Sequence, residues 1–315
     1  MSGDFLLVAR ALKLDREAAI AVECLRAVGV PCILLKGAAI ATWLYQDGET
    51  RPYGDVDLLV SPGQLTGAIE ALGELGYVHK LKSAHPAEFG PKELELFGPE
   101  DVCIDLHHGL IGVSVPSQHC WDVLIGRTTA FQLTPSVQVQ VLDPAARAMH
   151  LALHAAQNGP IDVKALADLE RGLAKLSREE WKEAARLAER LKATEAFAAG
   201  LRLLPAGKSL ADEMALPRRM TVELALRTRS APWDALFFAR LAQAPGAWGK
   251  VCLFARKVFP TAALLRANWP VARRGRVGLL LARVGYPVTQ AGHFVPALVA
   301  WAQARRAARR SQREQ

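Results

Sequence analysis

Two aspartates stand one residue apart in "GDVDLLV", residues 54–60, directly before a run of strand-forming side chains. Because side chains alternate between the two faces of a strand, Asp55 and Asp57 are expected on the same face. Carboxylates held this close repel each other unless a cation or a hydrogen-bond donor lies between them. The pair is therefore a candidate for binding a positively charged ligand.

A third carboxylate lies in "KELELFGPEDVCIDLHH", residues 92–108, which alternates polar and apolar side chains on both sides of a Gly-Pro-Glu-Asp turn. This pattern predicts a β-hairpin. On its second arm, Cys103, Asp105 and His107 are expected on one face and the apolar side chains on the other.

A metal site follows if the second arm of the hairpin lies beside the strand that begins near Asp55. Asp55, Asp57 and Asp105 would then converge on one face of a sheet. Hard oxygen ligands gathered in this way suit Mg²⁺, or Mn²⁺ in its place, which binds a few carboxylates together with substrate phosphates. Two such ions would activate an attacking hydroxyl and stabilise a leaving pyrophosphate.

The elements that must position these residues are both strands and helices. Residues 15–28 have apolar side chains at helical spacing, with Asp15 as the expected N-cap. A short buried strand follows, and Gly37 opens a second helix that ends near Leu44. This part of the chain is therefore predicted to be an α+β domain.

The pattern changes at Asp143, an expected helix N-cap followed by Pro at the first helical position. Everything after it is predicted to be helical, including a helix that starts with a capping box from Ser177 to Glu180. We therefore expect two domains: an α+β domain at residues 1–142 and an α-helical domain at residues 143–315 that ends in a basic tail.

Composition excludes several classes of protein. The chain has 315 residues, of which 51% are hydrophobic and 22% charged, so a packed core is expected. Its five cysteines form no CxxC pair, which argues against a disulfide framework or a thiolate zinc site. No secretory signal and no apolar run long enough to span a membrane is found. These observations predict a cytoplasmic protein.

Charge is distributed unevenly along the chain. From Arg218 to Arg310 there are 17 Lys and Arg residues against only Glu223 and Asp234, a local balance of +15. The last five residues cancel, so the first 217 residues carry −7 of the total of +8. The basic part could bind nucleic acid, an anionic membrane surface or an acidic protein or peptide, or it could simply keep helices solvated. Nucleic acid and membrane are not favoured.

The motifs "LLKGAA", "RPYGDVDLLV" and "IDLHH", in that order, resemble the uncharacterised nucleotidyltransferase family of the polymerase-β-like superfamily. The resemblance continues into "MHLALHAAQ" and "KALADLERGL". It implies a mixed sheet with flanking helices, followed by a helical domain that closes over the active site and selects the acceptor. The implied reaction moves a nucleoside monophosphate from a Mg²⁺-bound NTP, with ATP as the expected donor, to that acceptor.

The resemblance also implies roles for individual residues. Asp55 and Asp57 would bind both metal ions, and Asp105 would bind the catalytic metal and help to deprotonate the acceptor. Gly37, which has no Cβ, would let the backbone amides at Gly37-Ala38 approach the phosphates.

One position departs from the superfamily pattern. Ala38 stands where the wider superfamily usually has Ser or Gly after the first glycine, so a hydroxyl that would contact a phosphate is absent. Lys36 and Arg51 could supply the missing contacts, Lys36 as a point charge and Arg51 as a two-pronged donor.

Three further polar residues are candidates for supporting a metal ligand or contacting substrate. His107 shares the expected face of the third aspartate. His154 follows His150 by four residues on a helix, a spacing that suits zinc, packing or a side chain that faces the cleft. Asp168 is expected to pair with another helix or with a residue of the cleft.

Two alternatives to catalysis stay open. The fold could serve as a nucleotide-binding or ligand-binding module without transfer, which the missing hydroxyl favours and the three aspartates oppose. The basic half could instead make the chain an interaction protein. The acceptor is not identified by any residue pattern; a modified peptide or protein, a sugar or another small molecule would all fit.

Overall fold

The computed structural model describes residues 2–46, 49–79, 92–229, 231–232 and 234–313. These residues form two compact units. The first contains the described residues up to 157 together with 162–217, and the second contains 158–161 and 218–313. Each unit is described by itself.

The first unit is built on a mixed sheet. Its described strands follow the order β3-β4-β5-β2-β1-β7-β6. β1 pairs antiparallel with β2 and parallel with β7, while β2 pairs parallel with β5. The two pairs β4–β5 and β6–β7 are antiparallel. The strands span Cys32–Leu34 (β1), Val56–Val60 (β2), Val78–His79 (β3), Glu93–Phe97 (β4), Cys103–His107 (β5), Thr128–Gln132 (β6) and Gln138–Leu142 (β7).

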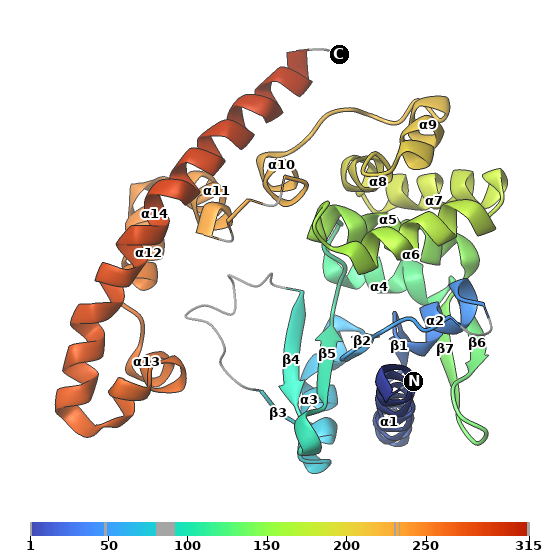
Figure 1. The fold of residues 1–315 in the computed structure, drawn as a ribbon, viewed down its shortest axis with the longest axis horizontal. Helices are drawn as coiled ribbons and strands as arrows, with labels where there is room; N and C mark the ends of the chain where they lie inside the picture. Colours follow the sequence, from blue (N-terminus) through green and yellow to red (C-terminus); the bar gives the residue numbers. More distant parts are fainter. Residues whose placement is uncertain (1, 47–48, 80–91, 230, 233, 314–315) are drawn as a thin grey trace. The chain divides into compact units, whose positions relative to one another are not determined.

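Helices flank this sheet: in the view of Figure 1, α1 and α3 lie low beside the strands, and α5 to α9 lie above the strands. The fold prediction of a mixed sheet with flanking helices and further helices after it is confirmed. The helices are α1 (Ser2–Ala27), α2 (Ala38–Leu44), α3 (Leu65–Glu74), α4 (Ser117–Ile125), α5 (Pro144–Asn158), α6 (Val163–Lys175), α7 (Arg178–Arg190), α8 (Thr194–Leu201) and α9 (Pro205–Glu213).

Alternation along the central strands separates a core face from a polar face. On β2, Val56, Leu58 and Val60 pack in one cluster with apolar side chains of α1 and α3. On β5, Ile104 and Leu106 belong to the same cluster. Because side chains alternate between the two faces of a strand, the residues between these apolar positions lie on the opposite face of the sheet. We call this the polar face.

Local signals in the sequence explain several element ends. Gly37 is the N-cap of α2, and Asp143 Oδ1 accepts a hydrogen bond from the Ala146 amide at the start of α5. The predicted capping box between Ser177 and Glu180 is present at α7. The predicted hairpin forms as β4 and β5.

The predicted N-cap at Asp15 is wrong. α1 begins at Ser2, so Asp15 lies within the helix. Its Oδ1 accepts a hydrogen bond from the Tyr53 hydroxyl at 2.8 Å instead of capping the backbone. An acidic residue before an amphipathic run suits both an N-cap and a mid-helix position, and the contact with Tyr53 could not be read from the sequence.

The second unit is helical. Its longest helix, α14, spans Gly275–Arg313 and packs with α10 (Val222–Arg227) and α11 (Asp234–Gln243) through small buried side chains such as Ala297 and Ala304. Shorter helices at Gly246–Val258 (α12) and Ala262–Asn268 (α13) complete it. Across the described residues of the chain, no helix combines the length and apolar character that crossing a membrane requires.

Candidate active site

Two of the three aspartates lie side by side on the polar face of the sheet. Asp57 on β2 lies directly opposite Asp105 on the parallel strand β5, and Asp55 stands two residues before Asp57. Burial raises the pKa of Asp105 to about 7, and the charges of Asp57 and then Asp55 add to this rise.

Asp57 is the most enclosed of the three carboxylates. Its Oδ1 accepts a hydrogen bond from Lys36 Nζ at 2.6 Å and lies 3.1 Å from His107 Nε2. Burial alone would raise the pKa of Asp57, but the Lys36 ammonium and the contact with His107 hold it well below its usual range. The Asp57 carboxylate is therefore ionised, and Lys36 is its counter-ion in this structure.

His107 connects two strands across the same face. Its Nε2 faces Asp57, while its Nδ1 lies 3.5 Å from Oε2 of Glu93 on β4. Glu93 is paired with His107 in the antiparallel register, so both side chains lie on the polar face. His107 thus orients the Asp57 carboxylate, as a residue that supports a metal ligand would do.

The donor atoms of the three aspartates are of the kind that binds a divalent cation. Within the described ranges, no set of three or more His, Cys, Asp or Glu side chains is close enough to hold a metal ion. Burial raises the pKa of Asp105, and repulsion from the charges of Asp57 and Asp55 raises it further. A bound cation would offset this repulsion. Carboxylate oxygens are also the ligands that Mg²⁺ and Mn²⁺ prefer.

Gly37 links β1 to α2 in a backbone conformation that other residues avoid. Its φ is 62° and its ψ is −129°, a region open in practice only to glycine. Ala38, the first residue of α2, is buried and offers no hydroxyl. The structure thus explains why glycine is needed for this turn, and the phosphate contacts of Gly37 and Ala38 stay a prediction.

Arg51 and Asp168 form a buried ion pair. Arg51 Nε donates to both carboxylate oxygens of Asp168, at 2.8 and 3.1 Å, and Nη2 donates to Oδ2 at 2.7 Å. Asp168 also accepts a hydrogen bond from the Tyr45 hydroxyl at 2.8 Å. Asp168 therefore pairs with the segment before β2, and the edge of Arg51 formed by Nε and Nη2 is used in this ion pair.

The imidazole rings of His150 and His154 on α5 are both buried. Burial and the positive charge of Lys36 lower the pKa of His150 to about 3, and the same two causes hold that of His154 well below its usual range. Both side chains are therefore neutral. The ring centroids are 6.3 Å apart, but the described residues supply no third ligand for a zinc site.

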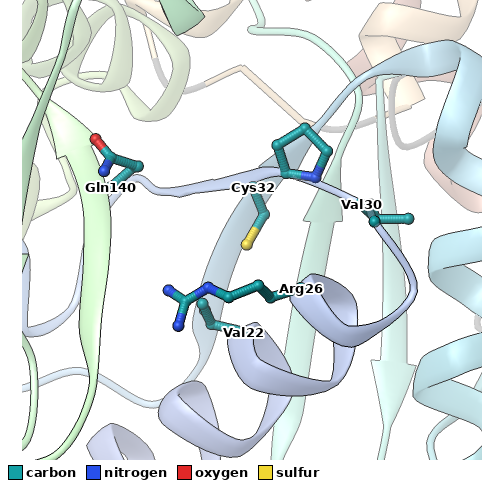
Figure 2. A pocket seen from close by; sticks show the side chains of 7 residues that line it. Val22, Arg26, Val30, Cys32 and Gln140 are labelled. Carbon is teal, nitrogen blue, oxygen red and sulfur yellow. The ribbon is translucent and has the colours of Figure 1, made fainter.

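A separate cavity of about 340 Å³ lies at the other end of β1. Figure 2 shows the Cys32 thiol pointing into it toward Arg26 and Val22. Burial raises the pKa of this thiol to about 12, so it is not a nucleophile at neutral pH. The cavity contains none of the predicted site residues, which lie beyond the opposite end of the strand.

Sequence reasoning missed two residues of this region. The Tyr45 hydroxyl donates to Asp168, which lies 123 positions later in the sequence, and no local sequence pattern predicts such a contact. Glu93 could have been found, because a hairpin that places Asp105 and His107 on the polar face also pairs one residue of the first arm with His107.

Three solved structures resemble the chain weakly. The antibiotic-resistance factor ANT(2'')-Ia is 13% identical with a TM-score of 0.39, over 61% of this chain and 95% of that one. The lincosamide antibiotic adenylyltransferase LnuA, in a lincomycin-bound structure, is 14% identical with a TM-score of 0.34, over 48% and 90%. An antigenic nucleotidyltransferase-like protein from Paracoccidioides brasiliensis is 15% identical with a TM-score of 0.35, over 58% and 91%. These TM-scores are too low for a substrate or a mechanism to be carried over.

Family membership rests on the sequence itself. No functionally curated protein matches the chain significantly. The profile of one family, described as uncharacterised nucleotidyltransferase, matches residues 5–206, which is more than half of the chain and includes the three aspartates, Lys36 and Arg51. The family resemblance predicted from the motifs is thereby confirmed. The chain belongs to the family of uncharacterised nucleotidyltransferases.

Proposed function

We propose that this protein transfers a nucleoside monophosphate from an NTP, with ATP as the expected donor, to an acceptor hydroxyl or amine. The observation that carries the proposal is the register of two parallel strands, which sets Asp57 opposite Asp105. Asp55 lies two residues before Asp57 and one residue before β2 begins, and the proposal adds its carboxylate to this pair.

Asp55, Asp57 and Asp105 would hold Mg²⁺, or Mn²⁺ in its place, together with the triphosphate. When bound, the metal would polarise the α-phosphate and neutralise the leaving pyrophosphate. His107 would keep the Asp57 carboxylate in position from behind, since it contacts Asp57 Oδ1 at 3.1 Å.

The reaction is an in-line displacement at the α-phosphorus. The bond between the acceptor atom and phosphorus forms while the bond from phosphorus to the bridging oxygen of pyrophosphate breaks. The acceptor loses a proton, which would pass to Asp105, and pyrophosphate leaves. Lys36 would exchange its contact with Asp57 for one with a phosphate oxygen, as its partly exposed ammonium allows. Catalysis then comes from positioning and charge, without a covalent enzyme intermediate.

The helical part after residue 142 is proposed to select the acceptor. Peptides, proteins, sugars and other small molecules stay open as acceptors. Nucleic acid or a membrane surface remains a less favoured partner of the basic residues after position 217.

The test is transfer of label from each α-labelled NTP, in Mg²⁺ or Mn²⁺, to components of a cell lysate fraction. Label should enter a product with wild-type protein and fall by at least about 100-fold with Asp57→Asn. The exposed Asp122→Asn on α4 is the matched control and should keep wild-type transfer. Equal labelling by wild type and Asp57→Asn would refute the proposal.

A second candidate is a module that binds nucleotide without transferring it. It is favoured by Ala38, which offers no hydroxyl at the start of α2, and by the engagement of Asp57 by Lys36. Calorimetric binding of Mg²⁺-NTP by the wild type, with no pyrophosphate released in any lysate fraction, would select this candidate over the enzyme.

A further inference from the structure

Arg51 has one nitrogen that forms no hydrogen bond with any described residue. Its side chain is 1% exposed, and its Nε and Nη2 are both committed to Asp168. Nη1 is buried and has no hydrogen-bond partner among the described residues. A buried N–H group of a guanidinium that lacks an acceptor is costly, so it indicates a ligand that supplies the acceptor.

The surroundings of Arg51 indicate that this ligand is an anion near the aspartates. Burial would lower the pKa of Arg51, but hydrogen bonds and charge from Asp168, with smaller contributions from Tyr45 and Asp57, raise it. Arg51 is thus a permanent cation, and it stands six residues before Asp57 in the sequence. The anionic part of an NTP bound at the aspartates is its triphosphate.

Three contacts fix the segment that carries Arg51 to α6. Tyr45 donates to Asp168 at 2.8 Å, and the Arg171 guanidinium lies 4.2 Å from the centroid of the Tyr45 ring. Arg171 also donates to Glu49 at 3.0 Å. With its Nε and Nη2 held on Asp168, the planar guanidinium has one orientation, and this orientation sets the direction of Nη1.

We infer that Tyr45 and Asp168 are positioning residues for Arg51, which they orient so that Nη1 donates to the pyrophosphate end of the nucleoside triphosphate. The inference rests on the proposed function and adds two residues, one on α6, to its phosphate site. It assigns Nη1 to the phosphate, because the edge formed by Nε and Nη2 contacts Asp168.

The competing explanation is a purely structural ion pair, which would lose stability when broken but would not change how strongly a nucleotide binds. The experiment therefore measures two quantities for each variant: thermal stability, and the dissociation constants of ATP, AMP and inorganic pyrophosphate in Mg²⁺. AMP lacks the pyrophosphate end and serves as an internal reference.

Tyr45→Phe should weaken ATP and pyrophosphate binding about fivefold, because Asp168 loses one of the bonds that hold it, while AMP binding stays within about twofold. Asp168→Asn should weaken ATP by about tenfold or more. Tyr77→Phe is the matched control: it removes a tyrosine–carboxylate bond of 2.9 Å to Glu17 on the core side of the sheet and should leave all three constants unchanged.

Folded Tyr45→Phe protein that binds ATP as the wild type does would overturn the inference, even if Asp168→Asn fails to fold. An equal loss of AMP and ATP affinity would also overturn it, because the pyrophosphate end would not be what Arg51 contacts. Wild-type protein that binds none of the three ligands would refute the proposed function as well, which separates the two failures.

Discussion

Lys36 Nζ lies 2.6 Å from Oδ1 of Asp57, whose side chain is 2% exposed. An ammonium therefore occupies coordination space at an aspartate that is proposed to bind metal. In the proposed reaction, Mg²⁺ and Lys36 would compete for the same oxygen, and a phosphate that draws Lys36 away would release Asp57 for the metal. Metal and nucleotide are thus expected to bind with positive coupling.

Lys36→Met should separate these two effects. Without the ammonium, Mg²⁺ alone should bind about tenfold more tightly, because it no longer displaces a counter-ion, whereas Mg²⁺-ATP should bind more weakly. Calorimetric titration of Mg²⁺ with and without ATP measures both. Lys13→Met, which breaks an exposed pair of 2.7 Å with Glu100, is the control and should change neither constant. Unchanged or weaker binding of Mg²⁺ alone by Lys36→Met would contradict the competition.

Asp105→Asn should stabilise the metal-free protein at pH 8. The folded-state pKa of about 7, raised by burial and by Asp57 and Asp55, lies above the unfolded value of about 3.9, so the free energy of unfolding falls as pH rises between these values. Asn cannot ionise, so the variant should gain ~1–3 kcal/mol at pH 8 and little near pH 4. Denaturant unfolding in EDTA at both pH values measures this. A gain of equal size at pH 4 would show that ionisation is not its cause.

His150→Gln should make the protein less sensitive to acid. The folded pKa of about 3, lowered by burial and by Lys36, lies below the unfolded value of about 6.5. The unfolded chain therefore takes up a proton first, and stability is lost as pH falls from about 6.5 toward 3. Between pH 6.5 and 5, the free energy of unfolding should change less steeply with pH in the variant than in the wild type. Adding His154→Gln to His150→Gln should reduce this slope further. Parallel slopes in all proteins would argue that neither imidazole is held neutral.

Gly37→Ala tests the turn between β1 and α2. At φ 62° the alanine pays a backbone penalty, expected at ~1–3 kcal/mol of the free energy of unfolding. A Cβ there would meet the Tyr53 ring only at 3.6 Å, an ordinary contact, so sterics add little. Gly73→Ala in α3 has open space and ordinary helical backbone, and should be neutral or slightly stabilising. A Gly37→Ala protein as stable as the wild type would mean that the turn can relax.

The polar face of the sheet could be predicted because it depends on local alternation. The period of two along residues 54–60 and 92–108 assigns each aspartate to a face, and the hairpin turn fixes one register. The pairing of β2 with β5 is not local, and only the family resemblance suggested it. Ion pairs such as Arg51 with Asp168, which join positions 117 apart, leave no periodic trace at all. For the same reason the sequence could not show that Nε and Nη2 of Arg51 both contact Asp168.

That ion pair also decides how the chain can be divided. A shortened chain that ends at residue 142 would keep every described strand and all three aspartates, yet it would leave the Arg51 guanidinium inside the protein without Asp168, since α6 would be missing. Swapping the helices of one homologue onto the strands of another would meet the same obstacle unless the partner of Arg51 travels with it. Chimeras of two family members are therefore expected to fold when the crossover lies after α6, and to be destabilised when it lies between β7 and α5.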